Sequence, residues 1–189
     1  MRKITEKTRT HDKPTLKLLD PQIDESANYH RQKAEAILRR HESLDSAREL
    51  LGWDIVCATE EGLRRVRIMK TRSFSGMGKK THNKEGIVQP PGHIYIMKSR
   101  AGMLLNISTG REGEASCVWV EEAKDLDSGM FLKGRNLVTF LGMENADRQP
   151  VFSEKFALVP GENPNKIERL SPAKEKASDN TTGIFEAVY

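Results

Sequence analysis

The middle of this chain alternates apolar and polar residues at every second position, which is the pattern of a half-buried β-strand. Two short runs show it, residues 65–69 and 93–97, and each leads into a pair of basic residues. The residues expected to face a core are Val66, Ile68, Ile94 and Ile96. The residues expected to face outward are Arg65, Arg67, His93 and Tyr95.

Further short apolar runs follow residue 93, separated by Gly, Asp and Asn. They predict strands at 93–98, 103–108, 116–121, 129–132, 136–141 and 151–159. Upstream, apolar residues at three-and-four spacing between 26 and 51 predict a helical segment, with Gly52 just past its end. We therefore expect an α+β protein, in which an N-terminal helical segment packs on a mainly antiparallel β-sheet or small barrel. Trp119 and Phe140 have apolar neighbours and are expected in the core.

Composition favours one compact domain with solvated ends. With 37% hydrophobic and 31% charged residues, the chain is too polar for all 189 residues to pack in one globular domain. The expected parts are a flexible basic arm at 1–25, a single globular domain at 26–159, and a flexible tail at 160–189. The tail ends in an apolar peptide, 184–189. This peptide is expected to dock either on the domain itself or on a protein partner by strand addition.

Cysteine usage and hydropathy indicate a cytoplasmic protein with no membrane contact. No apolar run approaches the roughly 20 residues that a membrane span needs, and the start of the chain has no apolar signal segment. The two cysteines, Cys57 and Cys117, lie in apolar segments without a nearby partner, so we expect reduced thiols.

Positive charge is concentrated between residues 62 and 109, which hold ten Lys or Arg and one acid, Glu85. Such a local excess attracts polyanions, so we predict a nucleic-acid interface for DNA or RNA. It would use a basic β-face and a basic Gly-rich loop at 73–92, where basic groups bind phosphates and aromatic rings stack bases. The predicted interface residues are Arg64, Arg65, Arg67, Lys70, Arg72, Phe74, Lys79, Lys80, His82, Lys84, His93, Tyr95, Lys98 and Arg100.

The sequence predicts no catalytic residue, metal site or cofactor, and the primary expectation is a non-enzymatic nucleic-acid-binding protein. One alternative comes from the order helix, Gly-Trp-Asp, strand, turn, strand, which resembles the start of many restriction-type nuclease folds. Such enzymes hold Mg²⁺ with an acid in one strand and an Asp/Glu-x-Lys in the next. Asp54 and Lys70 match two of these positions, but Ile68 stands at the third, so the motif is degenerate. Another alternative is a structural or assembly subunit that binds an acidic protein partner.

Overall fold

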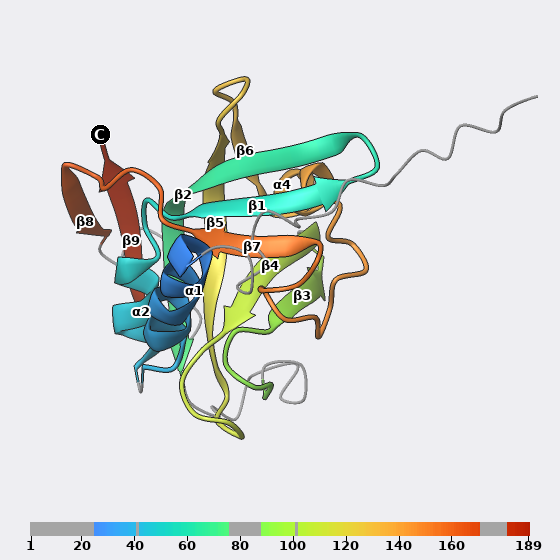
Figure 1. Ribbon diagram of the computed structural model, residues 1–189. Helices are drawn as coiled ribbons and strands as arrows, with labels where there is room; N and C mark the ends of the chain where they lie inside the picture. The colour runs from blue at the N-terminus through green and yellow to red at the C-terminus, as the bar shows by residue number, and fades with distance from the viewer. Residues whose placement is uncertain (1–24, 41, 76–87, 101, 171–180) are drawn as a thin grey trace, which may run out of the picture.

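The computed structural model describes residues 25–40, 42–75, 88–100, 102–170 and 181–189, and it has the predicted α+β architecture. In these residues, three short helices pack on a nine-stranded antiparallel sheet (Figure 1). None of the described helices is long and apolar enough to cross a membrane.

The predicted N-terminal helical segment consists of two helices, α1 (Glu25–Leu38) and α2 (Ser43–Glu49), which lie together on the left of Figure 1. The buried side chain of Ser46 joins them, because its Oγ donates to the carbonyl oxygen of Ile37 at 2.7 Å. Gly52 follows with a φ of +81°, and a Cβ there would lie 2.4 Å from the carbonyl oxygen of Glu162. Both the backbone angle and this close approach require glycine at the position.

The strands are β1 (Asp54–Thr59), β2 (Gly62–Ser75), β3 (Ile94–Ser99), β4 (Gly102–Ser108), β5 (Ser116–Asp125), β6 (Phe131–Lys133), β7 (Phe156–Val159), β8 (Lys166–Leu170) and β9 (Thr181–Val188). The main path of paired strands is β3-β4-β5-β2-β1-β7. In addition, β6 pairs with β5, and β9 pairs with β2 and β8. Because the path through the described strands ends at β3 and β7, it forms an open sheet and not the small barrel that the sequence also allowed.

Strand β2 contains a bulge that reverses which of its side chains face the core. The register between β2 and β5 shifts on both sides of Lys70. Before the bulge Val66 and Ile68 are buried in the core; after it Thr71 faces α2, where its Oγ1 donates to the carbonyl oxygen of Ala47 at 2.7 Å. We call the sheet surface opposite the core the outer face. On β2 its residues are Arg65, Arg67, Lys70, Arg72 and Phe74.

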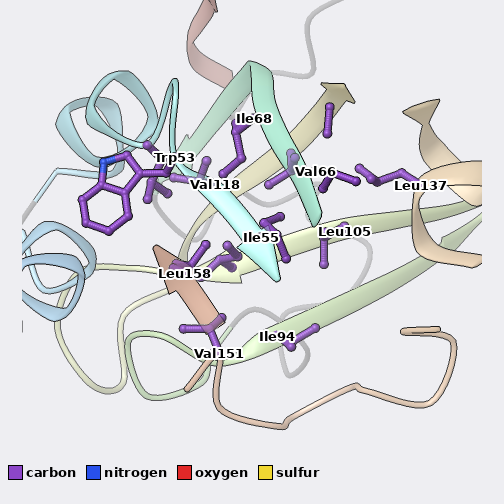
Figure 2. Close-up of a cluster of buried hydrophobic side chains, with 14 of the residues drawn as sticks. Trp53, Ile55, Val66, Ile68, Ile94, Leu105, Val118, Leu137, Val151 and Leu158 are labelled. Atoms are coloured by element: carbon purple, nitrogen blue, oxygen red, sulfur yellow. The ribbon is translucent and has the colours of Figure 1, made fainter. Parts of the chain in front are cut away.

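One continuous hydrophobic core lies between the helices and the inner face of the sheet. Figure 2 shows side chains from widely separated parts of the chain converging there, among them Ile55, Val66, Leu105 and Leu158. All four predicted core residues of the two alternating runs are buried in it (Val66, Ile68, Ile94 and Ile96). The inner-face alternation was therefore predicted correctly from the sequence.

The segment 136–141, predicted as a strand, is instead part of a helix, α4 (Gly134–Phe140). Gly134 begins it with a φ of +51°. The side chains buried against the sheet are Leu137, Val138 and Leu141. A short apolar run fits both a strand and a buried helix, so periodicity alone did not distinguish them. Phe140 packs against the core, as predicted.

The C-terminal region is part of the sheet. The stretch predicted as a flexible tail, 160–189, contains β8 and β9, and Phe185 and Ala187 of β9 lie in the core. The sequence left two docking places open for the apolar C-terminal peptide. The structure shows the peptide docked on its own domain, where β9 pairs with β2 along one edge and with β8 along the other. The basic arm expected at 1–25 lies outside the described residues except for Glu25.

Docking of β9 makes a testable contribution to stability. Replacing Phe185, which is 5% exposed, with alanine should lower the free energy of unfolding by about 3–4 kcal/mol, since a buried aromatic side chain is lost. Val188→Ala is the control: Val188 is 39% exposed at the end of the same strand and should cost under about 1 kcal/mol. Chemical denaturation measures both variants. Equal, small effects would contradict a β9 that is packed as part of the domain.

The turn between β5 and β6 is fixed by a buried carboxylate. Asp125 accepts hydrogen bonds from the backbone N–H groups of Asp127 (3.3 Å) and Ser128 (3.2 Å) and from the Ser128 hydroxyl. Burial opposes ionisation of Asp125, but these hydrogen bonds, with help from the Arg64 guanidinium, outweigh it and hold the pKa of the carboxyl below its ordinary value.

The lowered pKa of Asp125 predicts a pH dependence of stability. A carboxyl with a lower pKa in the folded state stabilises the fold above its unfolded pKa of about 3.9, and this contribution disappears as the pH falls through the folded value. The stability difference between wild type and Asp125→Asn should therefore be larger at neutral pH than below about pH 3. Denaturation curves at both pH values test this, and a difference that grows on acidification would refute it.

Candidate nucleic-acid interface

Cross-strand partners share a face of a sheet, so the strand registers define the rows of side chains on the outer face. The first row is Asp54, Arg67, Lys124 and Phe131. The second row is Glu186, Lys70, Glu122 and Lys133. The third row is Ile184, Arg72, Trp119, Asn106 and Tyr95. The fourth row is Phe74, Cys117 and Ser108. Two predicted interface residues from distant strands, Arg72 and Tyr95, thus stand in one row with β4 and β5 between them.

Aromatic rings gather in the third and fourth rows. The rings of Phe74 and Trp119 are stacked, with centroids 6.5 Å apart and planes at 29°. The guanidinium carbon of Arg72 lies 5.1 Å from the centroid of the Trp119 ring, which is cation–π geometry. Tyr95, predicted to face outward, is on this face but only 3% exposed, because it packs with Ala115 and Cys117 in a second apolar cluster. Phe74 is half-buried beside that cluster.

A carboxylate compensates the two basic residues nearest this aromatic cluster. Arg72 donates from Nε (3.2 Å) and Nη2 (3.1 Å) to Oε2 of Glu121. The ammonium group of Lys70 lies 3.5 Å from Oε1 of the same glutamate. All three side chains are at most 16% exposed. Both carboxylate oxygens of Glu121 therefore have a cationic partner.

A second buried carboxylate compensates the two arginines of the first alternating run. Asp54 is fully buried and accepts from Nε of Arg65 at 2.8 Å and from Nε of Arg67 at 2.9 Å. Arg67 also donates to Glu162 at 2.6 Å. The hydrogen bond to Asp54, opposed by burial, raises the pKa of Arg67. The Asp54 carboxylate is thus occupied by two arginines, which gives it a structural role in the sheet.

The remaining predicted residues fall into four groups. Lys98 and Arg100 are exposed at the turn between β3 and β4, and neither has a carboxylate within ion-pair distance among the described residues. Arg64 pairs with Glu61 and stacks on the Phe140 ring at 4.5 Å. His93 is half-buried, with Nδ1 2.9 Å from the carbonyl oxygen of Pro90. Lys79, Lys80, His82 and Lys84 lie outside the described residues. Whether these fourteen residues contact nucleic acid stays a prediction.

Sequence reasoning missed Trp119, Asn106 and Glu121 on the outer face. Trp119 was assigned to the core, but Val118 and Val120 occupy the inner face, so the same alternation would have placed Trp119 and Glu121 opposite them. The Trp119 indole Nε1 is buried and has no hydrogen-bond partner among the described residues. Asn106 is used internally, since its Nδ2 donates to the carbonyl oxygens of Tyr95 (3.3 Å) and Leu104 (3.1 Å).

The described residues give little basis for thiol or metal chemistry on this face. Both cysteines are free, as predicted, and burial raises the pKa of Cys117 to about 12, so its reactive thiolate is scarce near neutral pH. Within the described ranges, no group of three or more His, Cys, Asp or Glu side chains is arranged to hold a metal ion.

The structural role of Asp54 can be tested by substitution. Asp54→Ala leaves the guanidinium of Arg67, which is 15% exposed, without its main partner and should cost about 3 kcal/mol of unfolding free energy. Glu60→Ala, at an exposed acid of the β1–β2 turn, should change stability by less than about 0.5 kcal/mol. Thermal and chemical denaturation measure both. An Asp54→Ala protein as stable as wild type would show that the ion pairs are not structural.

Comparison with known proteins covers most of this interface. No individual curated protein matches the chain. The family model of methylpurine-DNA glycosylase (MPG) matches residues 37–136, which is more than half of the chain. The match runs from the end of α1 to the start of α4 and so includes β1–β6, the strands that form most of the outer face. The chain therefore belongs to the methylpurine-DNA glycosylase family and is a DNA-binding protein.

Proposed function

We propose that this protein binds DNA across the outer face of its sheet, holds an unstacked base against the aromatic cluster, and does not hydrolyse the glycosidic bond. Family membership supports the choice of DNA. The paired Glu121 is the observation on which the non-enzymatic part of the proposal rests. RNA binding and a cytoplasmic location stay predictions from the sequence.

The aromatic cluster is suited to an unstacked base. Proteins of the glycosylase class extrude a nucleotide from the duplex and hold the base by stacking and by hydrogen bonds to its edge. The stacked rings of Phe74 and Trp119 offer a π-surface. Both rings are half-buried, so part of each faces the outer surface. The aromatic pair thus matches the flat surface of a nucleobase.

The charges around the cluster oppose hydrolysis. Glycosidic cleavage develops positive charge on the sugar and needs a carboxylate, or a base, that is free to stabilise it or to activate water. Glu121 lies beside Arg72 of the third row. Both of its carboxylate oxygens are engaged, one by Lys70 and the other by Arg72. A guanidinium and an ammonium group beside the bound nucleotide would also raise the energy of a cationic transition state.

Glycosidic hydrolysis of a methylated purine is the second candidate function. The description of the family supports it, because the family model is that of a glycosylase. On the described part of the outer face, Glu121 would then be the residue that stabilises the sugar cation, after release from Arg72 or Lys70. The two candidates differ in one observable, the formation of abasic sites.

The proposal predicts salt-dependent DNA binding without base release. Wild-type protein should bind a labelled 20-base-pair duplex, and the logarithm of its affinity should fall linearly with the logarithm of salt concentration, since phosphate contacts release counterions. Lys98→Ala/Arg100→Ala, which removes two exposed cations, should reduce that slope by about two. Fluorescence anisotropy at several salt concentrations measures the effect. The same protein incubated with a duplex containing 7-methylguanine should give no more alkali-labile sites than buffer alone.

The control changes the same total charge elsewhere. Lys33→Ala/Arg48→Ala alters two exposed cations on α1 and α2, the helices that cover the inner face, and should leave the slope unchanged. Equal loss in both double variants would mean that net charge, and not the outer face, determines binding. Release of 7-methylguanine that Glu121→Gln abolishes would establish the glycosylase candidate and refute the non-enzymatic one. Arg65 and Arg67 are unsuitable for this test, because they hold the buried Asp54.

A further inference from the structure

A cavity of about 170 Å³ lies where α1 meets the segments that precede β3 and β7. None of its lining residues belongs to the four rows of the outer face. Since one water needs roughly 10–15 Å³ of such space, the cavity has room for a small ligand and not for a polymer. The residues that matter for its chemistry are Arg31, Glu35, Arg39, Pro91, His93 and Pro150.

The charged side of the cavity comes from α1. Arg31, Glu35 and Arg39 are spaced four residues apart, so they follow one another along one face of the helix and its last turn. The amide of Arg39 donates to the carbonyl oxygen of Glu35 at 2.9 Å, which continues the helical turn past Leu38. Two guanidinium groups therefore line the cavity against one carboxylate.

Arg31 is held in place with most of its hydrogen-bond donors open. Its Nε donates to Oε1 of Glu35 at 2.9 Å, and its guanidinium carbon lies 5.7 Å from the centroid of the Phe152 ring. A guanidinium group carries five N–H donors, and only Nε is used in this hydrogen bond. The four N–H donors on Nη1 and Nη2 have no acceptor in the part of the chain that the structure describes. The group is thus oriented before any ligand arrives.

Arg39 has no carboxylate partner within the described ranges, although it is exposed at the end of α1. The next residue, Arg40, differs in this respect, because its Nη1 lies 2.6 Å from Oε1 of Glu49. Arg40 does not line the cavity. Of these two adjacent arginines, the one without a partner is therefore the one at the cavity.

The opposite wall is fixed by hydrogen bonds. The amide of Gly92 donates to the carbonyl oxygen of Ser108 at 2.9 Å, and the amide of Val151 donates to the carbonyl oxygen of Gly92 at 2.8 Å. Nδ1 of His93 lies 2.9 Å from the carbonyl oxygen of Pro90. Because a carbonyl oxygen accepts, Nδ1 carries the hydrogen, which leaves Nε2 as the ring's other polar atom. A wall fixed in this way loses little entropy when a ligand binds.

We propose that this cavity binds a small phosphate monoester. Arg39 and the open Nη groups of Arg31 would contact the phosphate oxygens, and the organic group would lie against Leu38, Pro91 and Pro150. Guanidinium groups match phosphate geometry, and a phosphate monoester offers three terminal oxygens and nearly two negative charges near neutral pH. A carboxylate offers two oxygens and one charge, so it satisfies two arginines less well.

This site goes beyond the proposed DNA binding and does not depend on it. A phosphate monoester occurs both in free small molecules and at the 5′-phosphorylated end of a DNA strand. The chemistry recognised is the same, and the experiment distinguishes the two sources.

The test is isothermal titration of phenyl phosphate into wild-type protein in a phosphate-free buffer. Phenyl phosphate should bind at one site. Inorganic phosphate, which lacks the ring, and benzoate, which lacks the third oxygen, should each bind more weakly. Arg39→Gln should weaken the binding of phenyl phosphate about tenfold, the size expected for one lost charge-assisted hydrogen bond. In ¹H–¹⁵N spectra, phenyl phosphate should shift the amide resonances of Gly92 and His93.

Arg40→Gln is the matched control, since it removes the same charge from the adjacent residue outside the cavity. It should bind phenyl phosphate as wild type does. Equal weakening in both variants would mean that net charge determines binding, and this would refute the site. Absence of heat and of a Gly92 shift at millimolar phenyl phosphate would refute it as well.

Two 20-base-pair duplexes, with and without a 5′-phosphate, identify the source of the ligand. Competition with phenyl phosphate by the phosphorylated duplex alone would assign the site to a DNA end, and competition by neither duplex would assign it to a free phosphate monoester. Competition by both would show that the cavity is part of the DNA-binding surface and would refute a separate site. If wild type binds phenyl phosphate but no DNA, the proposed function fails while this site stands.

Discussion

Strand β2 is paired along both edges, and the bulge at Lys70 makes that arrangement possible. One edge pairs with β5 from Val66 to Ser75, whereas the other pairs with β1 up to Arg67 and with β9 from Lys70 onward. A bulge bends and twists a strand, so the two sections of β2 can meet different neighbours. The C-terminal strand, the helices packed above Thr71 and the whole outer face depend on this irregularity.

Five of the seven described cations in the segment 62–109 have carboxylate partners within the fold. Asp54 and Glu162 compensate Arg65 and Arg67, and Glu121 compensates Arg72 and Lys70. Burying these guanidinium groups without partners would cost several kcal/mol, so the acids that accompany them are a requirement of folding. Among the described residues, Lys98 and Arg100 are exposed at the β3–β4 turn and have no carboxylate within ion-pair distance. In the proposed mode of DNA binding, electrostatic attraction would therefore come from the rim of the outer face more than from its centre.

The centre of the outer face is aromatic and ion-paired, and the proposed binding of a base rests on this arrangement. Phe74, Trp119 and Tyr95 come from three different strands, and their meeting depends on the order β3-β4-β5-β2. Family membership identifies the polymer as DNA, and the paired Glu121 is the basis of our proposal that the protein binds a base without cleaving the glycosidic bond.

The sequence by itself determined the α+β class, the positions of most strands and the buried set Val66, Ile68, Ile94 and Ile96, because alternation within one strand follows from local backbone geometry. It did not determine the helix at 134–140, since a short apolar run fits two structures. Only the tertiary structure decided that Arg72 and Phe74 face outward, because the bulge reverses the alternation. The tertiary structure also decided the charges of the site, since Arg72 and Glu121 are 49 residues apart, and Arg67 and Glu162 are 95 residues apart. Pairing over such separations depends on strand order and register, which no local pattern encodes.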